Sequence, residues 1–153
     1  MTVHYRTLGI ILKKKERSEA DQIFTIYTKD FGKIGILGRG IRKTTSKLKS
    51  GMELFYLSEI EFIQGKRYKT LTDVNLVSDF KNLRKNLKKL TTAFKFSQII
   101  DRLLQNQEPD QKIWPFIKGS FDRLNNVDFK DRNLEFFYYY FVWNLFSFLG
   151  YRP

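Results

Sequence analysis

A loop that combines glycine, hydroxyl groups and positive charge occupies residues 38–51 (GRGIRKTTSKLKSG) and contains no acidic residue. Its glycines would let the backbone approach phosphate oxygens closely, and its hydroxyl and cationic side chains could contact the same oxygens. We therefore predict that this loop binds a polyanion. The side chains expected to make the contacts are Arg39, Arg42, Lys43, Lys47 and Lys49. The alternative is a solvated, mobile surface loop.

Further positive charge lies at the turn Lys66-Arg67 and between residues 80 and 100. The second region has no acidic residue, and a helix there would carry its cations on one face: Lys81, Arg84, Lys85, Lys88, Lys89 and Lys95. From these regions we add Lys66, Arg67, Lys85 and Lys88 to the predicted contacts. A helix face charged only for solubility explains the second region equally well.

Side chains that enzymes use for catalysis are scarce in this chain. It has one histidine, His4, and no cysteine, so no set of nucleophile, base and orienting group can be assembled. Glu59 and Glu61 share one strand face and could hold a divalent ion, but a polar strand face is the better explanation. Gly35 and Gly40 have P-loop spacing without the Lys and Ser or Thr that must follow. We predict a non-enzyme with no catalytic residue, cofactor or metal.

The chain as a whole is strongly basic, with 28 Lys and Arg against 16 Asp and Glu and a net charge of +12. This exceeds what the solubility of a small domain requires. The expected partner is therefore a polyanion: nucleic acid, an anionic membrane surface or an acidic protein. A basic protein without such a partner is the alternative. The lack of cysteine fits a reducing compartment and the N-terminus is unlike a signal peptide, so we expect a cytoplasmic protein.

The elements that must position these side chains change type near residue 78. Residues 5–77 have the pattern of short strands, which predicts a small antiparallel barrel. The strands are expected at Leu8–Leu12, Gln22–Thr28, Ile34–Leu37, Met52–Gln64 and Arg67–Val77, with Leu57, Ile60 and Phe62 in the core. Aromatic residues on this barrel could stack on bases, although most such residues form cores. The candidates are Tyr27, Phe55, Tyr56 and Tyr68.

Residues after 78 have helical periodicity. Helices are expected from Phe80 to Leu90, from Thr92 to Gln105, from Asp110 to Leu124 and from Asp131 to Leu149, the last ended by Gly150. In the fourth, Leu134–Leu149 is apolar on all sides, but these sixteen residues include Glu135, Asn144 and Ser147 and fall short of the about 20 apolar residues of a spanning helix. We expect it to be the buried central helix, or else to present an exposed aromatic patch to a partner.

Several short motifs, taken in order, resemble one known family. They are Glu19-Ala20-Asp21 leading into Ile23–Thr28, then Phe31–Ile34, Gly38–Lys43 and Ser46–Leu48, and finally Leu149–Pro153 (LGYRP). The first group resembles the N-terminal domain of RecO, a bacterial DNA repair and recombination mediator. The last resembles the LGY-x-P segment of that family's helical domain.

The resemblance implies an α+β protein with an OB-fold β-barrel over residues 1–78 and an all-α helical domain over residues 79–153. It implies a nucleoid-associated protein that binds single- and double-stranded DNA, anneals complementary strands and, with RecR, helps load recombinase onto strands coated by single-strand-binding protein. The family's basic barrel loop corresponds to Arg39, Arg42, Lys43 and Lys47. Many relatives continue with a cysteine-bearing, often zinc-binding, region, whereas this chain ends at Pro153, being either naturally short or cut there.

Two other functions remain open from the charge and pattern. One is an RNA-binding OB-fold module of the translation apparatus, which would use the same cations and aromatic residues. The other is a peripheral membrane protein that inserts the aromatic helix.

Overall fold

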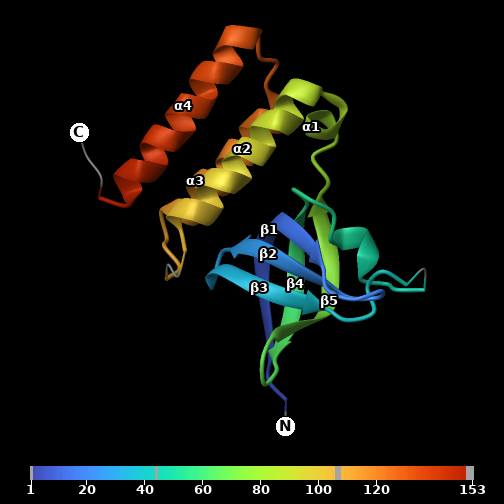
Figure 1. Ribbon diagram of the computed structural model, residues 1–153. Coiled ribbons are helices and arrows are strands. Elements are labelled where there is room, and N and C mark those ends of the chain that lie inside the picture. The colour runs from blue at the N-terminus through green and yellow to red at the C-terminus, as the bar shows by residue number, and fades with distance from the viewer. Residues whose placement is uncertain (1, 44, 106–107, 151–153) are drawn as a thin grey trace. The chain divides into compact units, whose positions relative to one another are not determined.

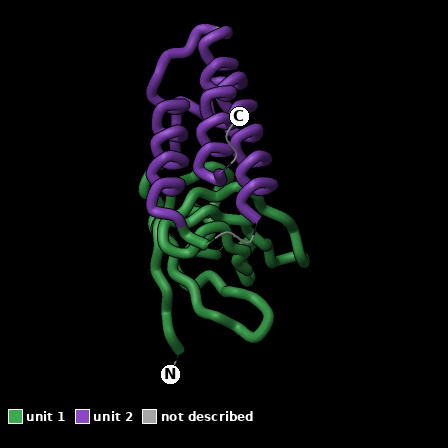
Figure 2. Tube along the Cα trace, turned by 90° about the vertical axis from the view of Figure 1, so that its left-hand side faces the viewer, with its two compact units in different colours: residues 1–79, 106–109 green, residues 80–105, 110–153 purple. Residues whose placement is uncertain are grey.

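The computed structural model describes residues 2–43, 45–105 and 108–150. The chain forms two compact units, shown in different colours in Figure 2. Residues 1–79 and 106–109 make up the barrel unit, and residues 80–105 and 110–153 make up the helical unit. The protein is thus α+β, with an OB-like barrel followed by helices, as the sequence predicted.

Five strands form the closed barrel seen in Figure 1, in the order β1-β2-β3-β5-β4. Their bounds are β1 His4–Glu16, β2 Gln22–Thr28, β3 Gly32–Gly38, β4 Leu57–Gln64 and β5 Lys69–Ser78. Neighbours pair antiparallel except β3 and β5, whose short parallel pairing closes the barrel. The five predicted strands are all present, but the barrel is not antiparallel throughout as expected, because β3 and β5 run parallel.

The first strand is much longer than predicted, because β1 serves two neighbours. Its first part pairs with β4 and its second part pairs with β2, with a bulge between Ile11 and Lys13. The run Lys13–Lys15, which was expected to end the strand, pairs with Phe24 and its neighbours on β2. These lysines are exposed, so their charge does not oppose the strand.

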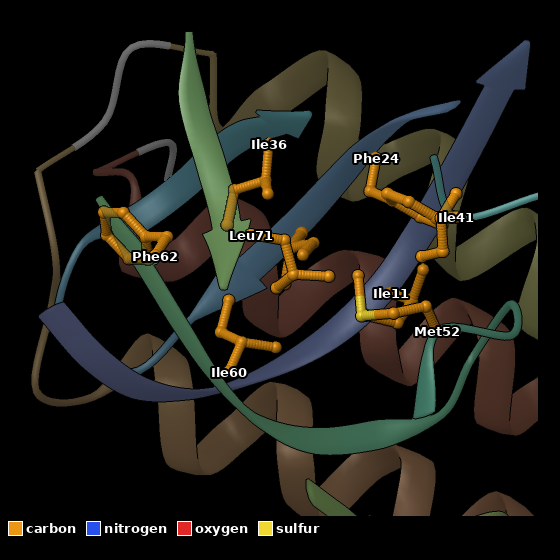
Figure 3. Packing of buried hydrophobic residues seen from close by; sticks show 9 residues of the cluster. Ile11, Phe24, Ile36, Ile41, Met52, Ile60, Phe62 and Leu71 are labelled. Atoms are coloured by element: carbon orange, nitrogen blue, oxygen red, sulfur yellow. The ribbon is translucent and has the colours of Figure 1, made fainter. Parts of the chain in front are cut away.

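The barrel interior is filled by one cluster of buried aliphatic and aromatic side chains, shown in Figure 3. They are Ile11, Phe24, Ile26, Ile36, Ile41, Met52, Ile60, Phe62 and Leu71. Every strand contributes, and Ile41 and Met52 come from the long connection between β3 and β4. The predicted core residues Leu57, Ile60 and Phe62 are buried. The basic loop is therefore anchored in the core through Ile41.

The helical unit contains α1 Lys81–Lys85, α2 Leu87–Leu103, α3 Ile113–Asn126 and α4 Asp131–Phe148. The helix predicted from Phe80 to Leu90 is interrupted at Asn86, which has extended backbone angles. The Asn86 side chain accepts hydrogen bonds from the backbone of Lys88 and Lys89 at 3.0 and 3.2 Å. Asparagine favours this N-cap position, so α2 begins at Leu87 rather than at Thr92.

The last helix is not buried on all sides. Leu134, Phe137, Phe141 and Leu145 of α4 are buried, and the ring of Phe141 stacks on Phe96 of α2 with centroids 3.9 Å apart. The opposite face is exposed and aromatic: Phe136, Tyr139, Tyr140 and Trp143. The expectation of a central buried helix is therefore wrong, and its alternative, an exposed aromatic patch, is found. Among the described residues, no helix is both long and apolar enough to cross a membrane.

Candidate nucleic-acid interface

A basic hollow of about 410 Å³ lies at the turn between β4 and β5. We call it the hairpin pocket; its charged and aromatic lining consists of Arg17, Asp21, Arg39, Lys66, Arg67 and Tyr68. Three parts of the chain that are distant in sequence meet here: the β1–β2 turn, the end of β3 and the β4–β5 turn.

Strand pairing explains why these side chains meet. The parallel pairing of β3 with β5 places Ile36 opposite Lys69 and Leu37 opposite Thr70, so the end of β3 lies beside the start of β5, directly after the β4–β5 turn. Arg39 follows the end of β3 and lines the pocket with that turn. The pairing of β2 with β3 places Gln22 opposite Gly38, which brings the β1–β2 turn to the same end of the barrel. In OB-folds the loops β1–β2 and β4–β5 commonly border the ligand, and the hairpin pocket has this location.

Backbone hydrogen bonds close both turns that border the pocket. The Arg17 N–H donates to the Asp21 carbonyl at 3.1 Å, and the Gly65 N–H donates to the Tyr68 carbonyl at 2.9 Å. A Cβ atom at position 65 would lie 2.7 Å from the Tyr68 carbonyl oxygen. Glycine is therefore required for this tight turn, which holds Tyr68 in place.

The pocket carries four cations and one carboxylate. Arg17, Arg39, Lys66 and Arg67 are all exposed. One oxygen of the Asp21 carboxylate accepts a hydrogen bond from the Gly40 N–H at 2.7 Å, which ties the start of the basic loop to the β1–β2 turn. The Arg17 guanidinium carbon lies 4.3 Å from the centre of the Tyr68 ring. The pocket thus combines excess positive charge with a planar aromatic surface, as in sites that bind single-stranded nucleic acid.

The remaining cations of the basic loop lie elsewhere on the barrel unit. Arg42 forms an ion pair with Glu16 at 3.2 Å and donates to the Ser18 carbonyl at 3.3 Å. Together with Lys14 and Lys49 it lines a second hollow of about 220 Å³. Lys43 and Lys47 are exposed, on either side of residue 44, which lies outside the described part of the chain. The backbone of Arg42 donates to the Ala20 carbonyl at 2.9 Å, so this part of the loop is held to the barrel.

Comparison with known proteins identifies the family. The model of the N-terminal domain of recombination protein O matches residues 1–80, just over half of the chain. The chain belongs to the RecO family. The final residues 151–153 of the LGYRP segment lie outside the described part of the structure.

Curated members of the RecO family match most of the chain, and each is named DNA repair protein RecO. The protein from Caldanaerobacter subterraneus subsp. tengcongensis is 29% identical over 97% of this chain and 59% of its own length. The protein from Acetivibrio thermocellus is 30% identical over 82% of this chain and 50% of its own length. The protein from Dehalococcoides mccartyi strain BAV1 is 29% identical over 97% of this chain and 57% of its own length. The chain therefore spans about half to three-fifths of the length of these relatives.

The cations predicted to share one helical face do not do so in this RecO chain. The break at Asn86 separates those of α1 from those of α2. Lys89 is buried, and its Nζ donates to the Asn125 carbonyl at 3.1 Å near the end of α3, where a cation is favourable. Lys85 and Lys88 remain exposed. Lys88 lines a hollow between α2 and α4 with Lys95 and Tyr138.

Of the aromatic residues proposed to stack on bases, the structure leaves Tyr68 in the most suitable place. Tyr27 and Phe55 are buried, with exposed fractions of 1% and 0%. Tyr56 packs against the barrel core. Only Tyr68 of the four lines the hairpin pocket. Arg17 was not among the predicted contacts, and the signal that could have found it is its position in the β1–β2 loop of an OB-fold.

The strand face that carries Glu59 and Glu61 is occupied by ion pairs. Arg6 on β1 contacts Glu59 at 2.9 Å and Glu61 at 3.0 Å. The hydroxyl of Thr72 donates to Glu61 at 2.8 Å. This hydrogen bond, together with Arg6, lowers the pKa of Glu61 below its ordinary value. The pair is therefore a polar strand face in which each carboxylate already has a cationic partner.

Proposed function

We propose that this RecO family chain is a non-enzymatic protein that binds single- and double-stranded DNA through phosphate contacts, with little sequence preference. The observation that supports this most strongly is the hairpin pocket, where four cations surround one carboxylate. Each phosphate that these side chains neutralise would release counterions, and this release drives binding that is independent of sequence.

The proposed contacts are not confined to the pocket. On the barrel unit they are Arg17, Arg39, Arg42, Lys43, Lys47, Lys49, Lys66 and Arg67, and on the helical unit they are Lys85 and Lys88. Arg42 would exchange its partner Glu16 for a phosphate. We propose that residues 1–78 form the main DNA-binding domain and that residues 79–153 extend the footprint.

The wider role that we propose is in recombinational DNA repair. By neutralising the phosphates of two strands the protein would reduce their repulsion and promote annealing of complementary sequences. With RecR it would help load recombinase onto strands coated by single-strand-binding protein. The curated relatives named for DNA repair support this role, although this chain spans only part of their length.

The test is fluorescence anisotropy with labelled single-stranded DNA across a salt series. We compare wild type with Arg39→Ala/Lys66→Ala/Arg67→Ala, which removes three cations of the hairpin pocket. The slope of log affinity against log salt should become shallower by about 0.7 for each lost phosphate contact. The matched control, Lys112→Ala/Lys130→Ala/Arg132→Ala, removes the same charge from exposed positions of the helical unit and should leave the slope nearly unchanged.

Equal slopes for the pocket variant and wild type would remove the hairpin pocket from the interface. Parallel titrations with duplex DNA, structured RNA and anionic vesicles separate the other functions. Binding to RNA alone would instead support a module of the translation apparatus, and binding to vesicles alone would support a membrane role.

A further inference from the structure

The hairpin pocket contains two planar groups that are stacked on each other. The Arg17 guanidinium lies over the Tyr68 ring, with 4.3 Å between the guanidinium carbon and the ring centre. The two residues come from different turns, and stacking between a guanidinium and an aromatic ring is favourable in itself. Phosphate binding requires only charge, so it gives no reason for an aromatic ring at this position.

The backbone is fixed where Tyr68 leads into β5. The Gly65 N–H donates to the Tyr68 carbonyl at 2.9 Å. The next residue, Lys69, begins β5 and pairs with Gln64 of β4 and Ile36 of β3. The ring therefore stands on a rigid part of the barrel, with little conformational entropy to lose when a ligand stacks on it.

We propose that the hairpin pocket seats one unpaired nucleotide of a DNA strand, with its base stacked on the Tyr68–Arg17 pair and its phosphate held by Lys66 and Arg67. This inference rests on the DNA binding proposed above. The hollow, of about 410 Å³, is in the range of sites that take one small ligand, about 300–1,000 Å³. A base inside a duplex is stacked and paired, so its faces cannot reach the ring.

The charges in the pocket give the nucleotide a direction. Asp21 lies in the same turn as Arg17 and is the one carboxylate among the described residues that line the pocket. Its negative charge disfavours a phosphate on that side. The Asp21 carboxylate accepts a hydrogen bond from the Gly40 N–H at 2.7 Å, so it lies beside Arg39 as well. Lys66 and Arg67 belong to the β4–β5 turn with Tyr68, so the phosphate is expected beside these two cations and the base beside Arg17. Stacking on an aromatic side chain is tolerant of base identity. The hairpin pocket should therefore distinguish unpaired from paired bases but not one base from another.

The experiment measures the affinity of the full chain for three probes of equal length: an oligodeoxythymidine, a strand of abasic deoxyribose phosphates and a duplex. Tyr68→Leu removes the ring and leaves the charge unchanged, whereas Tyr68→Phe keeps the ring and is the matched control. We expect Tyr68→Leu to weaken binding of oligodeoxythymidine by about fivefold to a hundredfold, as for the loss of one stacked base. Its affinity for the abasic strand and the duplex, and its salt slope, should equal those of wild type and Tyr68→Phe.

If Tyr68→Leu weakened binding to all three probes equally, or weakened binding to none of them, the proposed stacking on Tyr68 would be overturned, while the proposed DNA binding would stand. Failure of wild type to bind any of the probes would overturn the proposed function itself. Wild type alone supplies a second readout, which does not depend on the folding of the leucine variant. It should bind oligodeoxythymidine more tightly than the abasic strand by the same fivefold to hundredfold factor, and equal affinities would overturn the proposed stacking.

Discussion

Glu61 on β4 shows how a single side chain links the strands of the barrel. It accepts a hydrogen bond from Thr72 on β5 and contacts Arg6 on β1, so three strands share one carboxylate. Both interactions favour the ionised form and lower its pKa. The cluster also includes Asp73, 3.7 Å from Arg6. A residue first considered as a metal ligand is thus part of an ion-pair network on the barrel surface.

This lowered pKa predicts a pH-dependent contribution to stability. A carboxylate whose pKa is lower in the folded than in the unfolded state stabilises the fold above its ordinary pKa of 4.5, and the contribution is lost as pH falls through the folded value. Glu61→Gln should therefore lower the Tm near neutral pH, and the difference from wild type should shrink as pH falls below 4.5. Thermal unfolding monitored by circular dichroism at a series of pH values measures this. Glu19→Gln, at an exposed position of the β1–β2 turn, controls for the lost charge; an equal Tm difference at every pH would contradict the prediction.

At the level of single residues, composition identified many of the cations but not their grouping. Arg39, Lys66 and Arg67 were predicted as contacts, and the structure places them around one hollow. Arg17 was missed, because its relation to Tyr68 spans 51 positions and arises only from barrel closure. Lys89 was counted as part of a charged face, yet its amine is buried against the end of α3. Helical spacing alone does not reveal such a tertiary contact.

At the level of elements, the β4–β5 turn determines the shape of the hairpin pocket. Gly65→Ala would place a Cβ atom 2.7 Å from the Tyr68 carbonyl oxygen, so the turn would have to shift. We expect a loss of stability of about 1–3 kcal/mol, typical of an overpacked site, together with weaker binding of single-stranded DNA.

Gly119 provides a matched control for this substitution. It lies in α3, and a Cβ atom there would meet no heavy atom within 4 Å. Gly119→Ala should therefore stabilise the protein by about 0.5–1 kcal/mol, because alanine is the better residue in a helix. Urea unfolding measures both changes, and effects of the same sign in the two variants would contradict this account of the turn.

The type and order of the elements followed from their periodicity, whereas several boundaries did not. Alternation in Gln22–Thr28 predicted β2 with its observed bounds, and Gly150, with φ of +86°, follows the end of α4 as expected. The bounds of β1 were missed because a strand shared between two neighbours can continue into exposed lysines. The break at Asn86 was missed because the apolar spacing continues across it, and the cap is visible only through its hydrogen bonds.

At the level of the whole molecule, positive charge is present in both halves of the chain. Residues 1–78 hold 15 basic and 8 acidic residues (15 − 8 = +7), and residues 79–153 hold 13 and 8 (13 − 8 = +5). This distribution was available from the sequence and favours a footprint that involves both halves. The division of the chain into two compact units comes from the structure. The barrel has its own buried cluster, and each β-strand pairs with neighbours within residues 4–78.

The barrel therefore has what an independent domain requires, and residues 1–78 expressed alone should fold and bind single-stranded DNA. The five strands close into a barrel on their own, and domains of this size can fold alone. The fragment keeps the hairpin pocket, so Arg39→Ala/Lys66→Ala/Arg67→Ala should make its salt slope shallower by the same amount as in the full chain. Its own slope should be shallower than that of the full chain by about 0.7 for each phosphate contacted by Lys85 or Lys88. Circular dichroism establishes folding and anisotropy gives the slopes. A folded fragment without affinity for DNA would assign the interface to the helical unit, because only the cations of residues 79–153 would then remain to bind phosphate.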